Sequence, residues 1–147
     1  MNTTQKELEV CSLLSSSLNI PKPTPGDIVG RGFADVGYMD YLLSSNDNLY
    51  CFESATLIKI SNDELERLFL VPTFSNSVDL FERKTDSYVK EIKRIGSSSW
   101  SLIFEDSNQT LNDTFVGKTP REAVLLALAV IKKIYSNDGA SRKLRTT

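Results

Sequence analysis

Apolar residues recur at helical spacing near the beginning of the chain. Thr4 to Glu7 has the composition of a capping box, and apolar side chains follow every three or four residues as far as Leu18, shortly before Pro21. Ser61 to Glu64 is a second capping box, and the apolar positions after it predict a helix that ends near Leu70. Both patterns predict helices that place one apolar face against a core.

The most apolar stretch of the chain lies near its C-terminus. Thr119 caps this stretch, Pro120 takes the first helical position, and residues 123–134 are almost all apolar. A helix that is apolar on most faces lies at the centre of a core or between two layers. We expect burial at three positions with helical spacing, Leu125, Leu128 and Ile131. Leu126 is expected to face outward and to contribute to a homodimer, unless the helix is enclosed within one chain.

Short runs of apolar and aromatic residues predict strands in two regions. Residues 49–60 are expected to form two short strands separated by a break near Ser54. Trp100 to Phe104 is expected to form a strand in which Trp100, Leu102 and Phe104 share one face, and 110–116 is its expected partner strand. Residues 88–95 fit a helix and a strand equally well, so both alternatives remain open at this point.

Proline and glycine mark the segments between these elements. The prolines of 21–26 hold the chain extended, which predicts a connector. Gly30 to Gly37 is rich in glycine, and we expect it to form a loop with positive φ angles, although backbone amides in such a loop can also hold a phosphate. Residues 40–43 are expected to begin a short helix, and Ser77 to cap another.

These elements predict an α+β fold in which helices pack on a mainly antiparallel sheet, as a layered sandwich. We expect one domain over residues 1–136 and a disordered polar tail over residues 137–147. The 147-residue length suits one domain, and 40% hydrophobic residues suit a globular chain.

Charge and residue usage exclude several classes of function. The net charge of −2 makes nucleic acid an unlikely partner, because binding to nucleic acid usually needs a basic surplus. The chain contains no histidine, which removes Ser-His-Asp and Cys-His catalysis and the commonest metal ligand. We therefore expect no cofactor, no metal site and no enzymatic activity. Without a signal peptide or a long apolar run, a cytoplasmic protein with no membrane contact is expected.

The candidate binding residues lie around the glycine-rich segment and in the second predicted strand region. A mixture of cations, carboxylates and phenols between positions 31 and 41 suits contact with a ligand, and it is equally typical of a polar loop. Trp100 suits stacking on a ligand ring, and it also suits a core position. We select five candidates for ligand or partner binding: Arg31, Phe33, Asp35, Tyr38 and Trp100.

The segment from about residue 71 to residue 135 resembles a known family. Its features are Pro72, a helix start at residues 75–77, Trp100 in a strand, and residues 117–123 opening an alanine-rich helix. In this combination the segment resembles the phage ABA-sandwich family of small α-β-α layered proteins. The resemblance implies a phage or prophage setting, with a host cell cytoplasm as the location, and it transfers no catalytic residues.

The expected function is therefore binding. On the resemblance, we expect a small phage-type protein that inhibits a host protein or sequesters a small nucleotide-like ligand. The alternative, suggested by size, low pI and an apolar terminal helix, is an acidic secretion chaperone or adaptor for a bacterial protein. A carboxylate-dependent enzyme ranks last.

Overall fold

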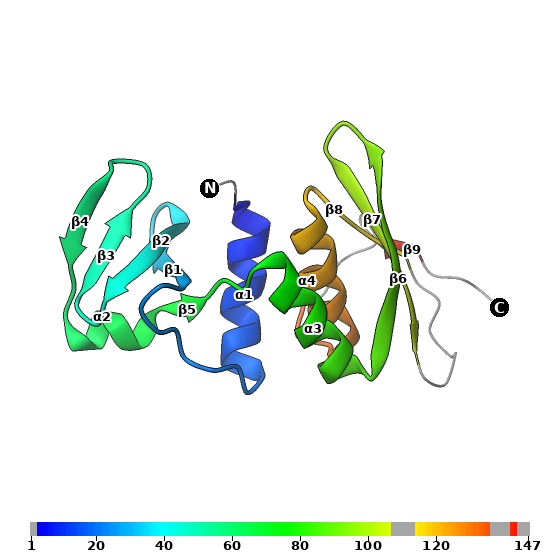
Figure 1. Cartoon of the computed structure of the whole chain (residues 1–147), viewed down its shortest axis with the longest axis horizontal. Helices are drawn as coiled ribbons and strands as arrows, with labels where there is room; N and C mark the ends of the chain where they lie inside the picture. The colour runs from blue at the N-terminus through cyan, green and yellow to red at the C-terminus, as the bar shows by residue number, and fades with distance from the viewer. Residues whose placement is uncertain (1–2, 107–113, 136–141, 144–147) are drawn as a thin grey trace. The chain divides into compact units, whose positions relative to one another are not determined.

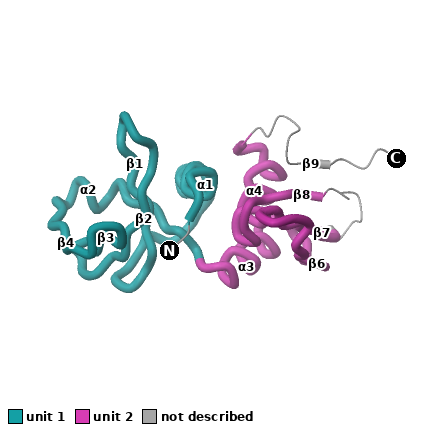
Figure 2. The backbone as a smooth tube through the Cα atoms, turned by 90° about the horizontal axis from the view of Figure 1, so that it is seen from above, with its two compact units in different colours: residues 1–72 teal, residues 73–147 magenta. Residues whose placement is uncertain are grey.

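The chain divides into two compact units. The computed structural model describes residues 3–106, 114–135 and 142–143 (Figure 1). Unit 1 spans Met1–Pro72 and unit 2 spans Thr73–Thr147 (Figure 2). Each unit has its own antiparallel sheet and its own helices, where the sequence leads us to expect one domain over residues 1–136. The predicted tail, residues 137–147, lies outside the described residues except for a short strand at 142–143.

The predicted fold class is confirmed, because helices accompany antiparallel sheets in both units. None of the helices in the described part of the chain has the length and apolar character that crossing a bilayer requires.

Unit 1 contains a five-stranded sheet in the order β4-β3-β2-β1-β5, with two helices. β1 to β4 form an up-and-down meander, and β5 returns after α2 to pair with β1. The elements are α1 (Gln5–Ser17), β1 (Ile28–Phe33), β2 (Gly37–Ser45), β3 (Asn48–Cys51), β4 (Thr56–Lys59), α2 (Asn62–Arg67) and β5 (Phe69–Leu70).

The N-terminal helix and the strands of residues 49–60 confirm their predictions. Thr4 and Glu7 form the expected capping box at the start of α1. The predicted break near Ser54 is the turn between β3 and β4. The second capping box, Ser61 with Glu64, also forms, but α2 ends at Arg67 and the chain then enters β5.

Residues 27–43 form most of the β1–β2 hairpin, so the predicted glycine loop and short helix are wrong. Gly30 and Gly32 occupy strand positions, and of the three glycines Gly37 has a positive φ, +89°. A Cβ atom at Gly30 would lie 2.1 Å from the ring of Phe69 in β5. The expectation failed because a glycine within a strand can mark the close approach of another element as well as a turn.

The two faces of the unit 1 sheet are covered by different helices. Alternate residues of β1 to β3 point toward α2 and form a core cluster with Ile60 and Leu68; its buried members are Val29, Tyr41, Leu43, Leu49, Cys51, Ile60 and Leu68. α1 packs on β2, β5 and β1 from the other face, burying Leu8 and Leu14 among others. The period of two along each strand therefore separates the residues facing α1 from those facing α2.

Unit 2 contains the second sheet, in the order β6-β7-β8-β9. Its elements are α3 (Phe74–Thr85), β6 (Ser87–Gly96), β7 (Ser99–Asp106), β8 (Thr114–Gly117), α4 (Pro120–Ile131) and β9 (Arg142–Lys143). Residues 88–95 therefore form a strand, which settles the ambiguity between helix and strand. The cap of α3 is Thr73, while the predicted cap, Ser77, is a buried residue of the first turns.

Both unit 2 helices pack on the same face of its sheet. α3 contacts β6, α4 contacts β7 and β8, and the two helices contact each other (Figure 1). The rings of Phe81, Phe104 and Phe115 lie between these layers, with centroids 5.2 Å and 6.0 Å apart in successive pairs. These rings connect one helix to the two central strands.

The last helix is enclosed to a greater extent than expected. All residues from Glu122 to Ala129 are buried, which confirms the predicted burial of Leu125 and Leu128, whereas Ile131 is only partly buried. Leu126 is 1% exposed, so the expectation that it faces outward is wrong. Gly117, just before α4, allows the start of the helix to approach β8 closely, since a Cβ there would lie 2.4 Å from the backbone nitrogen of Ala123.

Candidate functional site

Two of the five candidate residues, Arg31 and Phe33, lie together on the α2 side of the unit 1 sheet. The guanidinium of Arg31 lies 5.2 Å from the centre of the Phe33 ring, within cation–π range. Arg31 also forms an ion pair with Glu64 of α2, and 25% of its side chain is exposed. The positive charge of Arg31 is therefore already neutralised by Glu64, so little of that charge remains for binding a ligand.

The electrostatics of this cluster follow from the same contacts. The backbone N–H of Ser61 donates to the Glu64 carboxylate, and together with the charge of Arg31 this holds the pKa of Glu64 below its usual value. Burial raises the pKa of the Tyr41 phenol, although the nearby Arg31 acts in the opposite direction. The cluster therefore joins α2 to the sheet.

The other three candidates are not part of this cluster. Asp35 is exposed in the turn between β1 and β2. Tyr38 points to the α1 side of the sheet, where its ring meets Phe69 edge-to-face at 5.7 Å. Trp100 lies half-buried on β7, in unit 2. The structure thus does not assemble the five candidates into one site.

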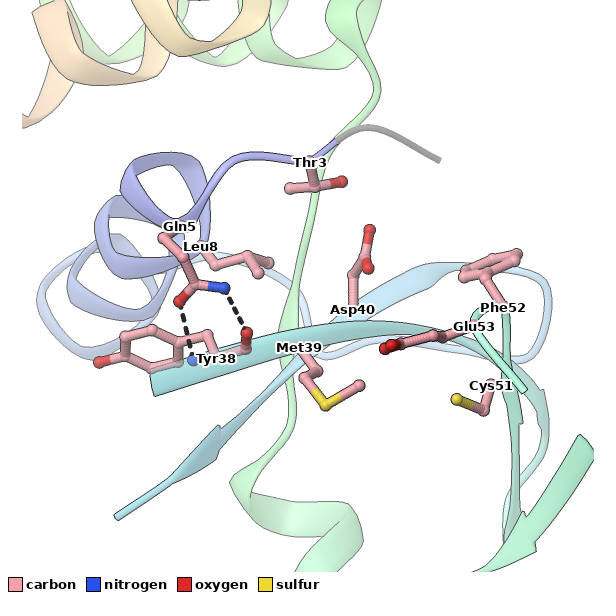
Figure 3. A pocket seen from close by; sticks show the side chains of 9 residues that line it. All are labelled: Thr3, Gln5, Leu8, Tyr38, Met39, Asp40, Cys51, Phe52 and Glu53. Atoms are coloured by element: carbon pink, nitrogen blue, oxygen red, sulfur yellow. Dashed lines mark hydrogen bonds between the residues drawn. The ribbon is translucent and has the colours of Figure 1, made fainter. Parts of the chain in front are cut away.

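A pocket of about 360 Å³ opens between the start of α1 and strands β2 and β3 of unit 1 (Figure 3). We call it the acidic pocket, because its charged lining residues are both carboxylates. Nine residues line it: Thr3, Gln5, Leu8, Tyr38, Met39, Asp40, Cys51, Phe52 and Glu53.

Strand alternation decides which of these side chains face α1. Asp40 and Phe52 extend to the side of Thr3 and Leu8, whereas Met39 and Cys51 extend to the opposite side (Figure 3). Leu42 pairs with Tyr50 in the β2–β3 ladder, so Asp40 and Phe52 each lie two residues from a paired position and emerge near each other. Asp40 and Phe52 therefore define the interior of the acidic pocket.

The wall of the pocket is fixed by one side chain of α1. The Gln5 amide donates to the backbone oxygen of Tyr38 at 2.6 Å and accepts from its backbone nitrogen at 3.0 Å (Figure 3). This two-point contact holds the first turn of α1 against the start of β2, and it places Leu8 over the strand. The acidic pocket is therefore preformed.

One oxygen of Asp40 is the most informative atom in this region. Asp40 Oδ2 is buried and has no hydrogen-bond partner among the described residues. Leaving a buried acceptor unsatisfied costs roughly 1–3 kcal/mol, more if it is charged. Glu53 adds a second carboxylate, and no Lys or Arg belongs to the lining in the described part of the chain. These carboxylates can accept hydrogen bonds from a cation. The face of the Phe52 ring can also attract a cation, through a cation–π interaction.

Cys51 is a lining residue with altered acidity, but its side chain is not directed into the acidic pocket. Hydrogen bonds from the hydroxyl and backbone of Ser54 lower the pKa of the Cys51 thiol. The thiol belongs to the buried cluster on the α2 side, at 6% exposure. Its position favours a structural role over a nucleophilic one.

Sequence reasoning found part of this site. Asp40 belongs to the polar mixture of residues 31–41 but not to the five candidates, and Phe52 and Glu53 were missed. The alternation of Met39 and Tyr41 with the charged Asp40 is the signal that places Asp40 on the other face of a strand, although the pattern is short because Leu42 and Leu43 are both apolar. Nothing in the sequence indicates that the end of β3 lies beside it.

No family model, curated protein or solved structure matches the chain. Within the described residues, no group of three or more Cys, Asp or Glu side chains is arranged to hold a metal ion. The function therefore has to be inferred from the chemistry of the acidic pocket.

Proposed function

We propose that the protein is a non-catalytic binding protein whose unit 1 takes a cationic nitrogen group, an amine or a guanidinium, into the acidic pocket. The observation that carries this proposal is the buried, unpartnered Oδ2 of Asp40. A protonated nitrogen that donates to this oxygen satisfies it and neutralises the carboxylate, a stronger interaction than a neutral hydrogen bond.

The charge of the whole unit supports the same choice of ligand. Residues 1–72 contain 10 Asp or Glu and 5 Lys or Arg, a net charge of −5. Such a surplus attracts cations over a distance of about one Debye length, roughly 8 Å at physiological salt. An anionic ligand in the acidic pocket would instead meet Asp40 and Glu53, with no cation among the described lining residues to offset them.

Of the two functions expected for a phage-type protein, inhibition of a host protein fits this pocket better. The side chain of a Lys or Arg on a host protein has the required chemistry, whereas a nucleotide-like ligand is anionic. The phage or prophage setting stays in the proposal on the sequence resemblance alone, because unit 2 carries both of its described helices on one face of the sheet and not one on each.

The alternative of a secretion chaperone rests on exposed apolar surface. The large apolar residues that are exposed in the described part of the chain are spread along their units: Val36, Leu57, Phe74, Tyr88 and Ile95. Val36 is in a turn of unit 1 and Leu57 is in β4, while Tyr88 and Ile95 are at opposite ends of β6. Among the described residues of each unit, these positions do not form one patch that would favour a chaperone over the binding protein.

Calorimetric titration with spermidine and with a short Lys- and Arg-containing peptide tests the proposal. We expect at least one to bind, and Asp40→Asn to weaken it by about tenfold or more, because a charged hydrogen bond is lost. Glu53→Gln should weaken binding less, since Glu53 is exposed. Preference for spermidine identifies a free amine, and preference for the peptide identifies a protein partner.

Asp63→Asn is the matched control for the change in charge. Asp63 is exposed on α2, outside the acidic pocket, and the substitution also removes one negative charge from unit 1. Binding should be nearly unchanged in this variant. An equal loss with Asp63→Asn would show general charge attraction, and either that result or the absence of binding by both ligands would reject the proposal.

The homodimer also remains a proposal, but its surface cannot be the buried run of α4. We place it instead on β6, which is an edge strand of the unit 2 sheet among the described residues and carries the exposed Tyr88 and Ile95. Edge strands can pair with a second copy through their free backbone groups. Sedimentation equilibrium at micromolar concentration decides, because a mass of 16.4 kDa throughout would exclude the dimer.

A further inference from the structure

Unit 1 has a second hollow region, on the side of its proline connector. A pocket of about 380 Å³ lies between the second half of α1, the connector and the α2–β5 segment. A smaller pocket of about 210 Å³ adjoins it and shares four of its lining residues, Lys22, Pro23, Glu66 and Leu68. We treat the two as one groove and call it the connector groove; Lys22 and Glu66 line both of its parts.

The charge of the connector groove is opposite in sign to that of the acidic pocket. Lys22 and Arg67 line it, and Glu66 is its one acidic residue. Neither cation has an ion pair or a side-chain hydrogen bond among the described residues, in contrast to Arg31, which is paired with Glu64. Both cations are exposed, so the lack of an ion pair is ordinary for each of them; what distinguishes them is that they line the same hollow, in a unit with a net negative charge. Two cations at one hollow can hold an anion together.

Hydroxyl groups add neutral donors on the opposite wall. Ser12, Ser15 and Ser16 line the groove, and their spacing of three and four residues places them on one face of α1. The Ser16 hydroxyl donates to the backbone oxygen of Ser12 at 3.1 Å. Serine is a poor residue for a helix interior, so helix stability does not account for its repetition here.

The connector that forms one edge of the groove is held in place. Pro21 and Pro23 restrict its backbone. The Thr24 backbone oxygen accepts from the Asp27 backbone nitrogen at 3.0 Å, and the Thr24 backbone nitrogen donates to the Asp27 carboxylate at 2.8 Å. The backbone of Asp27 in turn accepts from Leu43 of β2 at 2.9 Å. The groove is therefore preformed, which lowers the entropic cost of binding.

We infer that the connector groove binds a phosphate monoester of a small organic molecule, a function separate from that of the acidic pocket. Lys22 and Arg67 hold the phosphate, because guanidinium and ammonium groups are the side chains that match its charge and geometry. The organic part lies along the apolar surface of Pro21 and Leu68. A nucleotide-like ligand, expected from the sequence, thus fits this groove and not the glycine-rich segment.

Titration of the full chain with inorganic phosphate and with adenosine monophosphate, followed by NMR or calorimetry at low salt, tests this inference. We expect saturable binding of adenosine monophosphate, with weaker binding of inorganic phosphate because it lacks the organic part. Lys22→Gln and Arg67→Gln should each weaken binding by roughly tenfold, as expected for the loss of one charged hydrogen-bond donor. Glu66→Gln should strengthen it, since a like charge is removed, and a purely structural role would not produce this opposite sign.

Two control variants separate the groove from general charge effects and from the acidic pocket. Lys59→Gln removes an exposed cation of β4 that lies outside the groove, and it should leave phosphate binding nearly unchanged. Asp40→Asn should also leave phosphate binding nearly unchanged, so the proposals for the two pockets can be rejected independently of each other. No saturable binding of either phosphate compound, or an equal loss with Lys59→Gln, would overturn the inference.

Discussion

The two units use the same kinds of element in different ways. In unit 1 the helices lie on opposite faces of a sheet of short strands, and the α2 side has a small core cluster. In unit 2 both helices lie on one face, and one of them is buried along eight consecutive residues, 122–129. Unit 2 therefore concentrates its apolar residues in one layer, whereas unit 1 divides them between two and leaves polar side chains between its elements.

The charges of the units differ as well. Residues 73–147 contain 12 Lys or Arg and 9 Asp or Glu, a net charge of +3, against −5 for residues 1–72. The total of −2 hides this asymmetry. Unit 1 also contains both pockets for which we propose ligands. Both proposed binding sites therefore belong to the acidic unit, while unit 2 has the larger apolar layer.

The largest expected effect tests the core of unit 2. Leu128→Ala should lower the free energy of unfolding by about 2–5 kcal/mol, because the fully buried leucine leaves a cavity. The fluorescence of Trp100, the one tryptophan of the chain, reports on this unit during denaturation by urea. Lys132→Ala, at an exposed position after α4, is the control and should have little effect. A loss below about 1 kcal/mol for Leu128→Ala would mean that the layer is loosely packed.

The second prediction compares two glycines that permit close approach. Gly117→Ala should destabilise unit 2 by about 1–3 kcal/mol, because its Cβ would meet the backbone of Ala123, which cannot move without displacing α4. Gly30→Ala should cost less, because the obstacle is the ring of Phe69, a side chain that can turn. Thermal unfolding of both variants measures the difference, and the reverse order would contradict the contrast in rigidity.

The third prediction concerns how much the unsatisfied oxygen of Asp40 in the acidic pocket destabilises the fold. Asp40→Ala should leave the stability of the unliganded protein unchanged or raise it by about 1 kcal/mol, because a buried acceptor without a partner is removed. Leu43→Ala, on the same strand but in the core cluster, should be clearly destabilising. Chemical denaturation compares the two. Destabilisation by Asp40→Ala comparable to that by Leu43→Ala would show that Asp40 supports the fold.

The smallest expected effect is a change in how the stability of unit 1 depends on pH in the acidic range. The pKa of Glu64 is lowered in the folded state, so this group contributes stability above its unfolded pKa, about 4.3. That contribution is lost as the pH falls through the folded pKa. Glu64→Gln should therefore make the fall in stability below about pH 5 shallower. Circular dichroism melts between neutral pH and that range measure the slope, and an unchanged slope would show that neither the Ser61 N–H nor Arg31 makes the charged form of Glu64 stabilising.

The helices illustrate what could be predicted locally. The caps at Thr4, Ser61 and Thr119 all accept the expected backbone hydrogen bonds, because the cap and its partner are three residues apart and need no other part of the chain. At α4, Glu122 also accepts a hydrogen bond from the backbone nitrogen of Lys118 at 2.8 Å, which further fixes the start of the helix. Local spacing thus determined the start of each of these helices.

The site could not be predicted in the same way. Asp40 and Phe52 meet because the β2–β3 register brings them to neighbouring positions, and α1 closes over them from far away in the sequence. Similarly, Lys22 and Arg67 come from a connector and a helix that are separated by the whole β1–β4 meander. Register and packing on this scale depend on contacts that a local pattern does not contain.

By itself, the sequence determined the fold class, the capped helices, the strands around residues 49–60 and 100–104, and the burial of Leu125 and Leu128. Each of these depends on a period or a cap within a few residues. Only the tertiary structure decided that Gly30 faces Phe69, that the chain forms two units, and that Leu126 is enclosed. Those outcomes depend on which distant element covers a given face. The free energy that stabilises one such arrangement over another comes from side-chain packing and not from local propensity.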